Sequence, residues 1–474
     1  MASPRFWGYL VLGCESCALS MCFGNGKETS RSTVKKLILF MSALSNYRML
    51  STLRTKARLV PALGFLFITL LISQSLLAQT TFTYTGGSAS WTTATWVKTG
   101  TATAATYPGE IAGENHIASA TVAGTLTLNA NITNSSLRQV TVNTGVLDLG
   151  ANSLTINAGP GTLSGTGTAT IAGGSTLTVP GAFSLAGLSV SSGTPTINFG
   201  GNISAGAAFN LTGSRAQILG NSAIAGNAIF GRLQIAAAAA VSTPNHITTT
   251  GSFINNGTLT QGAGDTLYIA GDTIGGTGTS FLTHLQFLGA NAKRMGQNIN
   301  LKGDYIQGGS GAVVAYAGRT TVNNGTSSTV KVSFGGSGQL GFFNVTVGNT
   351  ANSKLVLNRS VFIYGTANGT NADGSDAALG IGNATGVQFD AGTQSVVFAG
   401  IGGSLVNNNF NYIGIGTTLF SATNFVLANP TRFGNLQIGS GVTFAPAVKV
   451  RVQGSFNALS GSYRSEERRV GKEC

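Results

Sequence analysis

The side chains best suited to chemistry between residues 80 and 463 are nine carboxylates, because acid–base catalysis and binding of hard metal ions both need clustered carboxyl groups. The tightest group is Asn371-Ala372-Asp373-Gly374-Ser375-Asp376. Asp373 and Asp376 are therefore candidate Ca²⁺ ligands, but the stretch lacks the regular acidic spacing and bidentate Glu of a dedicated calcium loop. A solvated Asp/Gly turn is the favoured interpretation. The nine carboxylates are Glu110, Glu114, Asp148, Asp265, Asp272, Asp304, Asp373, Asp376 and Asp390.

Two threonines are candidate modification sites. Asp265-Thr266-Leu267 and Asp272-Thr273-Ile274 match the Asp-Thr-aliphatic acceptor that some bacterial exporters use for O-glycosylation. Thr266 and Thr273 are the acceptor residues in that interpretation, although such tripeptides also arise by chance.

The remaining metal-binding residue types form no recognisable site. His116, His246 and His284 are isolated from one another and from any cysteine. Cys14, Cys17 and Cys22 resemble a metal knuckle or redox pair, but a fourth ligand is missing and the group precedes the export signal described below. We therefore expect no metal, no cofactor and no disulfide in the exported protein.

The positive charge of the chain is not a nucleic-acid signal. The 474 residues carry 27 Lys and Arg against 14 Asp and Glu, a formal charge of +13, but more than half of that excess lies in residues 1–79. The only local basic group in the exported region, Lys293-Arg294 with Lys302 and Arg319, lacks the interleaved aromatic residues of a single-strand binder. We expect no binding to nucleic acid.

Residues 49–79 have the pattern of a secretory signal peptide. Three basic residues after Met49 precede an apolar run, Ala62 to Ile72, and a small-residue exit that ends at Ala78-Gln79. The run is too short for a membrane span. Because signal peptides begin chains, residues 1–48 are interpreted as a mistranslated upstream segment. The protein is expected to be secreted or held at the cell surface.

The last eleven residues, 464–474, match the in-frame translation of a widely used sequencing adapter. They are interpreted as an artefact, so the repeat region is expected to be truncated at residue 463. Any attachment to a membrane would then depend on a missing C-terminal anchor.

Short alternating runs predict an all-β protein. Thr125-Leu126-Thr127-Leu128, Thr176-Leu177-Thr178-Val179 and Thr329-Val330-Lys331-Val332 each place apolar residues on one face and mostly Thr on the other, and Gly or Asn follows. No long apolar stripe with helical periodicity is present.

A repeated pair of markers predicts stacked turns. Leu233 and Phe253, Leu285 and Tyr305, and Leu436 and Phe456 lie in similar hexapeptides and tripeptides, and 20 residues separate the members of each pair. The copies themselves start at irregular intervals, which a solenoid tolerates by inserting loops between turns. We therefore predict a right-handed parallel β-helix over residues 119–463, with residues 80–118 as an N-terminal cap that contains Trp91 and Trp96. Tandem β-sandwich domains are the alternative fold.

The order Ser90-Trp91, Trp96, Tyr107-Pro108-Gly109-Glu110 and then Gly145-Val146-Leu147-Asp148-Leu149 resembles β-strand repeat surface proteins. Those are adhesin-like exoproteins, many of them exported by the type IX route. The resemblance implies a cell-surface or secreted adhesive or structural role. We expect no catalysis, a monomer, and contacts with surface glycans or proteins of other cells or with a matrix polymer. It carries over no catalytic residues. The alternative is a carbohydrate-active β-helix enzyme, a polysaccharide lyase or hydrolase, which would need several of the nine acids in one groove.

Overall fold

The computed structural model describes residues 79–459, with gaps at 135, 158–160, 325–328, 335–338, 349, 372 and 374. The regular elements of this part are β-strands and one short 3-10 helix, η3 (Asn408–Phe410). No helix within the described ranges is long and apolar enough to cross a membrane. The expected signal peptide, apart from Gln79, lies outside the described residues, as do the upstream segment and the adapter-like tail.

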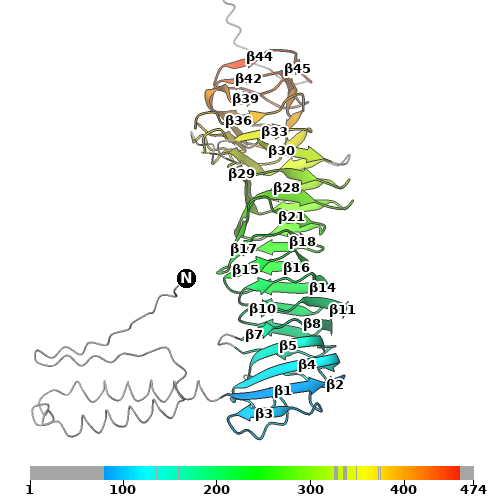
Figure 1. Ribbon diagram of the computed structural model, residues 1–474. Helices are drawn as coiled ribbons and strands as arrows, with labels where there is room; N and C mark the ends of the chain where they lie inside the picture. Colours follow the sequence, from blue (N-terminus) through cyan, green and yellow to red (C-terminus); the bar gives the residue numbers. More distant parts are fainter. Residues whose placement is uncertain are drawn as a thin grey trace, which may run out of the picture. The chain divides into compact units, whose positions relative to one another are not determined.

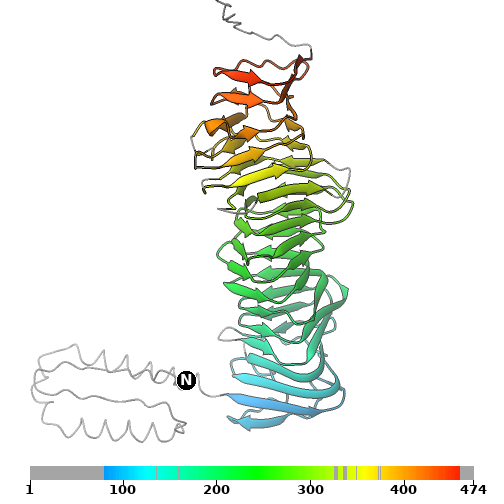
Figure 2. The ribbon, with the colours of Figure 1, turned by 45° about the horizontal axis from the view of Figure 1, so that its top comes forward.

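Alternation of side chains along short strands explains the fold. In β9 (Thr176–Val179) the two threonines face outward, while Leu177 and Val179 are buried. Successive side chains of a strand point to opposite faces, so this pattern leaves one apolar face to be covered. The chain covers it by coiling into a parallel β-solenoid of about 15 turns, with the turns stacked in chain order (Figures 1 and 2).

Three parallel sheets enclose the core, and each turn contributes a strand to sheet III, then sheet II, then sheet I. Sheet I contains β6 (Leu154–Thr155), β9, β12 (Thr196–Phe199), β19 (Phe253–Asn255), β22 (Thr273–Gly275), β25 (Lys293–Gly296), β28 (Val313–Ala317), β31 (Leu340–Phe342), β34 (Val361–Ile363), β37 (Val396–Phe398), β40 (Thr417–Phe420), β43 (Asn435–Ile438) and β45 (Phe456–Ala458).

Sheets II and III are built in the same way. Sheet II contains β8 (Thr168–Gly173), β11 (Gly187–Gly193), β18 (Ile247–Thr249), β21 (Thr266–Ile269), β24 (His284–Phe287), β27 (Tyr305–Gln307), β30 (Thr329–Phe334), β33 (Lys354–Leu357), β36 (Gln388–Asp390) and β39 (Tyr412–Ile413). Sheet III contains β7 (Thr162–Ser164), β10 (Phe183–Ser184), β13 (Ile203–Ser204), β15 (Ser222–Ala225), β17 (Ala240–Thr243), β20 (Thr258–Gln261), β23 (Thr279–Leu282), β26 (Asn298–Leu301), β29 (Arg319–Val322), β32 (Asn344–Val347), β35 (Leu379–Ile381), β38 (Ser404–Asn407) and β41 (Val426–Leu427).

Four long strands pass around a corner and belong to two sheets: β4 (His116–Thr127), β5 (Leu137–Asp148), β14 (Ala208–Ile218) and β16 (Ala228–Ile235). The first part of β16 pairs with β18 in sheet II and its last part with β19 in sheet I. Near the C-terminal end β42 (Thr431–Phe433) pairs with β44 (Val450–Val452). The uninterrupted stack confirms the predicted solenoid and excludes tandem sandwich domains.

The first turn is closed by an antiparallel strand. β1 (Thr80–Gly86) and β2 (Ala89–Ser90) pair in parallel with β4, while β3 (Val97–Gly100) pairs antiparallel with β1. Trp91 and Trp96 are buried beneath this edge, and their indole nitrogens donate hydrogen bonds to the carbonyls of Pro108 and Trp91. Buried indoles with satisfied donors fit a packing role.

One turn carries a long insertion. Val345 in β32 is the partner of Leu379 in β35, and the described residues of the range 364–378 form the connection from β34 in sheet I to β35 in sheet III. In a turn without an insertion, in-register partners such as Leu233 and Phe253 are only 20 residues apart. The irregular intervals between sequence copies therefore reflect loops of different length around a constant core.

Candidate functional site on the outer face of sheet I

Most carboxylates of the described region hold turns of the backbone. Asp148 accepts hydrogen bonds from the Gly150 amide and the Thr170 hydroxyl, and Asp390 accepts one from the Gly392 amide. Asp304 accepts the Lys331 amide of the next turn. No three acidic, histidine or cysteine side chains in the described ranges lie together as a metal group would require.

Asp373 and Asp376, the candidate calcium ligands, lie in the inserted loop. Asp373 Oδ1 accepts hydrogen bonds from the amide and hydroxyl of Ser375, and Asp376 Oδ1 accepts one from the Asn371 amide. Arg319 lies nearby: its guanidinium donates to Thr346 Oγ1 and to the Ala377 carbonyl at 2.9 and 2.8 Å. Burial lowers the pKa of Arg319, while the two aspartates oppose that shift. The contacts of this loop are those of an anchored turn.

The two candidate glycosylation sites differ in exposure. Thr266 is 9% exposed, and its amide donates to His246 Nδ1 across neighbouring turns. Thr273 is half-buried on the outward side of β22, where it is the in-register partner of Arg294.

The structure disperses the basic group near residues 293–319. Lys293 is 1% exposed, its Nζ donates to the Ala270 carbonyl at 2.7 Å, and burial lowers its pKa. Arg294 faces outward from sheet I, whereas Arg319 belongs to sheet III. The three histidines each accept a backbone amide at Nδ1, from Gly109, Thr266 and Asp304. These contacts indicate a structural role for the three histidines.

Two arginines that the sequence analysis did not single out form a distinctive outer feature of sheet I. Arg215 in β14 and Arg232 in β16 are in-register partners on adjacent turns, and both side chains are exposed. Among the described residues, neither guanidinium has a hydrogen bond or a carboxylate partner. Two like charges opposite each other on neighbouring strands repel. The pair therefore presents uncompensated positive charge to solvent.

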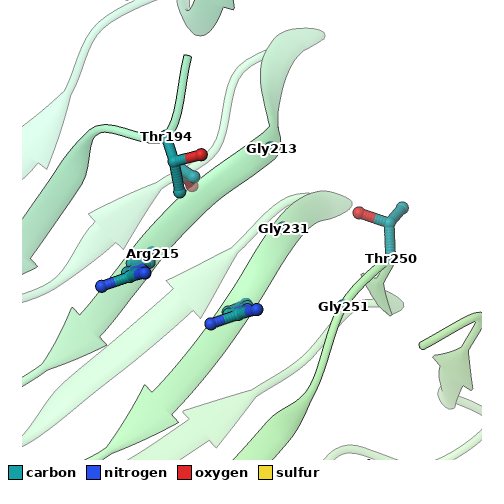
Figure 3. A pocket seen from close by; sticks show the side chains of 8 residues that line it. Thr194, Gly213, Arg215, Gly231, Thr250 and Gly251 are labelled. Carbon is teal, nitrogen blue, oxygen red and sulfur yellow. The ribbon is translucent and has the colours of Figure 1, made fainter. Parts of the chain in front are cut away.

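A shallow hollow of about 270 Å³ lies beside the two arginines, lined by Thr194, Gly213, Ser214, Arg215, Gly231, Arg232, Thr250 and Gly251. Figure 3 shows Arg215 extending from its strand, with Gly213, Gly231 and Gly251 along the corner. The glycines stack turn upon turn: a Cβ on Gly251 would lie 3.0 Å from the Gly231 carbonyl oxygen. Because these glycines carry no side chains, their backbones stack closely and the hollow stays open to solvent.

A row of amide and hydroxyl groups runs beside the arginines. Gln217 and Gln234 are partners on the same two turns, with 3.5 Å between Gln217 Nε2 and Gln234 Oε1. Asn198 on the preceding turn donates to Thr178 Oγ1 at 3.2 Å. Together with Arg215 and Arg232, the two glutamines and Ile254 line a second hollow of about 340 Å³. Planar amides and guanidinium groups are suited to polar ligands with ring hydroxyls and acid groups.

The same outer face becomes aromatic farther along the stack. Three turns beyond Arg232, the Arg294 guanidinium lies 5.3 Å from the centre of the Tyr316 ring, and Tyr316 is 48% exposed. Phe362 and Tyr364 then stack at 6.0 Å with a 10° interplanar angle. Burial raises the pKa of Tyr364. We call this surface the arginine–aromatic face and define it by Arg215, Arg232, Arg294, Tyr316, Phe362 and Tyr364.

The arginine pair could have been found from a short repeat in the sequence. Arg215-Ala216-Gln217-Ile218 and Arg232-Leu233-Gln234-Ile235 are two copies of Arg-X-Gln-Ile, seventeen residues apart. The structure shows that these copies occupy the same position on successive turns. The next members of the row, Ser252 and Thr273, carry no charge, so the pattern stops before Arg294.

No protein-family model, no curated protein and no solved structure matches this chain. The structure itself shows a solenoid of short repeated β-strands.

Proposed function

We propose that this protein is an exported, adhesin-like structural and interaction protein that binds extended surface or matrix polymers along its solenoid. The observation that carries the proposal is the outer face of sheet I, where polar, basic and then aromatic side chains follow one another on stacked, in-register strands. A ligand that is itself a polymer can make many weak contacts with such a surface, and their combined strength greatly exceeds that of one contact.

The scaffold supports this role by being stiff. Each turn is hydrogen-bonded to the turns before and after it, and buried residues form one connected core along the stack. With ~4.8 Å between neighbouring strands, 15 turns extend over roughly 70 Å. Side chains fixed on such a backbone lose little further conformational freedom on binding, which favours affinity.

The proposed site of action is outside the cell. The basic, apolar and small-residue order of residues 49–79 supports export, and the resemblance to adhesin-like exoproteins supports type IX secretion. Fusing residues 49–79 to a reporter enzyme that is active only after export tests the first step. Activity that disappears when Leu66 and Leu70 are both replaced by Arg supports export. A fusion that is produced at full length but stays inactive inside the cell contradicts it.

Binding is tested with the purified protein on immobilised polymers and on whole cells. We expect saturable, reversible retention on at least one surface glycan, protein or matrix polymer, with the polymer unchanged after long incubation. Release of shortened chains would instead favour the polysaccharide lyase or hydrolase alternative. Failure to bind any surface or polymer would contradict the proposed function.

A further inference from the structure

We propose that the arginine–aromatic face binds an anionic polysaccharide chain that lies along the solenoid axis, with its acid groups against Arg215, Arg232 and Arg294. The proposal rests on the proposed function and names the chemical class of its ligand. The shared recognition chemistry is an acidic sugar, which can carry either a uronate carboxylate or a sulfate ester.

Charge is the first argument. Arg215 and Arg232 repel each other across one turn and, within the described part of the chain, have no acidic partner to relieve the repulsion. An anion between two guanidinium groups would accept hydrogen bonds from both, and hydrogen bonds between charged groups are stronger than neutral ones. Because the pair is exposed, an anion reaches it without any rearrangement of the backbone.

The repeat distance is the second argument. Arg232 and Arg294 are separated by three turns, or about 14 Å at ~4.8 Å per turn. One turn is close to the length of one hexose unit in an extended polysaccharide. A chain aligned with the axis would therefore meet a new row of side chains with about each sugar. Ser252 and Thr273 occupy the two turns in between, and their hydroxyls suit the ring hydroxyls of the sugars.

The change from polar to aromatic side chains is the third argument. Gln217 and Gln234 flank the arginine pair, and Tyr316 begins the aromatic part of the face. Amides hydrogen-bond to sugar hydroxyls, while aromatic rings cover the apolar faces of sugar rings. A nucleic-acid strand would instead favour aromatic residues interleaved with the cations to stack successive bases. Of the three arginines on this face, only Arg294 lies against an aromatic ring, and the pair of Arg215 and Arg232 is several turns away from Tyr316.

The test uses two pairs of polymers, each with a charged member and a neutral member on the same sugar backbone: polygalacturonate with its fully methyl-esterified form, and dextran sulfate with dextran. Binding of the full chain is measured by biolayer interferometry at several salt concentrations. We expect binding to at least one charged member and weaker binding to its neutral counterpart, and added salt should weaken it. The pair that responds identifies the acid group as a carboxylate or a sulfate.

Variants locate the site. Arg215→Gln/Arg232→Gln should weaken binding of the charged polymer by at least about tenfold, because each charged hydrogen bond contributes that much. Tyr316→Ala should weaken it by about threefold to tenfold through loss of ring contact. Lys302→Gln/Arg451→Gln removes the same amount of charge from exposed positions elsewhere and should leave binding within about twofold. Unchanged circular dichroism of each variant confirms that the fold is intact.

Three results would overturn the inference: equal binding of the arginine variant and the wild type, equal binding of neutral and charged polymers, or tighter binding of single-stranded DNA through the same arginines. Each of the first two results, obtained with a wild-type protein that binds polymer, leaves the proposed function standing. A wild-type protein that binds no polymer or surface contradicts both.

Discussion

Leu233 and Phe253 are in-register partners on adjacent turns of sheet I, and both side chains are buried in the core. The column continues through Ile274 and Met295, so each residue is covered on both sides by the turns next to it. A solenoid is stabilised chiefly by such nearest-neighbour contacts, because every turn touches only the turns before and after it.

Replacing Phe253 with Ala should therefore lower the free energy of unfolding by about 3–5 kcal/mol, through lost burial and the cavity left behind. The matched control is Phe281→Ala, since Phe281 is 42% exposed whereas Phe253 is fully buried. Urea denaturation followed by circular dichroism measures both variants. A control variant as unstable as Phe253→Ala would show that burial in this column does not determine stability.

The stacked glycines at the corner between sheets II and I allow a second comparison of two variants. A Cβ at Gly271 would overlap the carbonyl group of Gly251 on the previous turn, whereas a Cβ at Gly174 meets nothing within 4 Å. Gly271→Ala should destabilise the protein by about 1–3 kcal/mol, because the stacked backbones must separate. Gly174→Ala should be neutral or slightly stabilising, since it restricts the unfolded chain. Thermal melting of the two variants compares them, and equal melting temperatures would contradict the steric explanation.

The arrangement of turns was predictable because core positions repeat locally. The 20-residue separation of the sequence markers is one turn: Leu285 pairs with Tyr305, and Leu436 pairs with Phe456. The markers do not define one face, however, because Leu285 belongs to sheet II and Leu436 to sheet I. Inward positions of all three sheets enter the same core, so the same apolar pattern serves on any of them.

The outer face was harder to predict. Which outward side chains become neighbours depends on the length of every turn, and the steps along the row vary: Arg232 follows Arg215 by seventeen residues, while Arg294 follows Thr273 by twenty-one. Sequence proximity instead grouped Lys293 with Arg294, although adjacent strand residues point to opposite faces. The structure buries Lys293 and exposes Arg294.

Arg319 is expected to anchor the inserted loop. Its guanidinium joins Thr346 in sheet III to the carbonyl of Ala377 at the end of the loop. Arg319→Met should lower the free energy of unfolding by about 1.5–3 kcal/mol, because hydrogen bonds from a charged donor are lost. It should also speed proteolytic cleavage between residues 366 and 376. Lys302→Met, at an exposed position, is the control, and equal cleavage rates in the two variants would contradict the anchoring role.

The same loop predicts the response to calcium. Because Asp373 and Asp376 already accept hydrogen bonds from their own loop and lie near Arg319, a divalent cation would have to displace these contacts. We expect the melting temperature to be the same in millimolar Ca²⁺ and in excess EDTA. A rise with Ca²⁺ that is abolished by Asp373→Asn/Asp376→Asn would instead establish the calcium site considered from the sequence.

The N-terminal turn should be sensitive to acid. His116 is buried, its Nδ1 accepts the Gly109 amide at 2.9 Å, and its Nε2 lies 2.7 Å from Glu114. Hydrogen bonds from Thr103 and His116 lower the pKa of Glu114 from its ordinary 4.5. A carboxylate with a lowered pKa stabilises the folded state above its unfolded pKa, and the contribution is lost as the pH falls through the folded pKa. The first turn should therefore lose stability as the pH falls below 4.5.

Tryptophan fluorescence measures this loss of stability. Trp7→Phe leaves Trp91 and Trp96, both in the first turn, as the only tryptophans of the chain. In that background, we expect a red shift of the emission on acidification. Glu114→Gln should reduce its dependence on pH, because the replaced group no longer titrates, and should also weaken the turn at neutral pH by removing the charged acceptor. Asp390→Asn, which alters a carboxylate of β36 far along the stack, should leave the transition where it is. If Glu114→Gln and Asp390→Asn gave the same pH profile, the acid sensitivity would have to arise outside the His116–Glu114 contact.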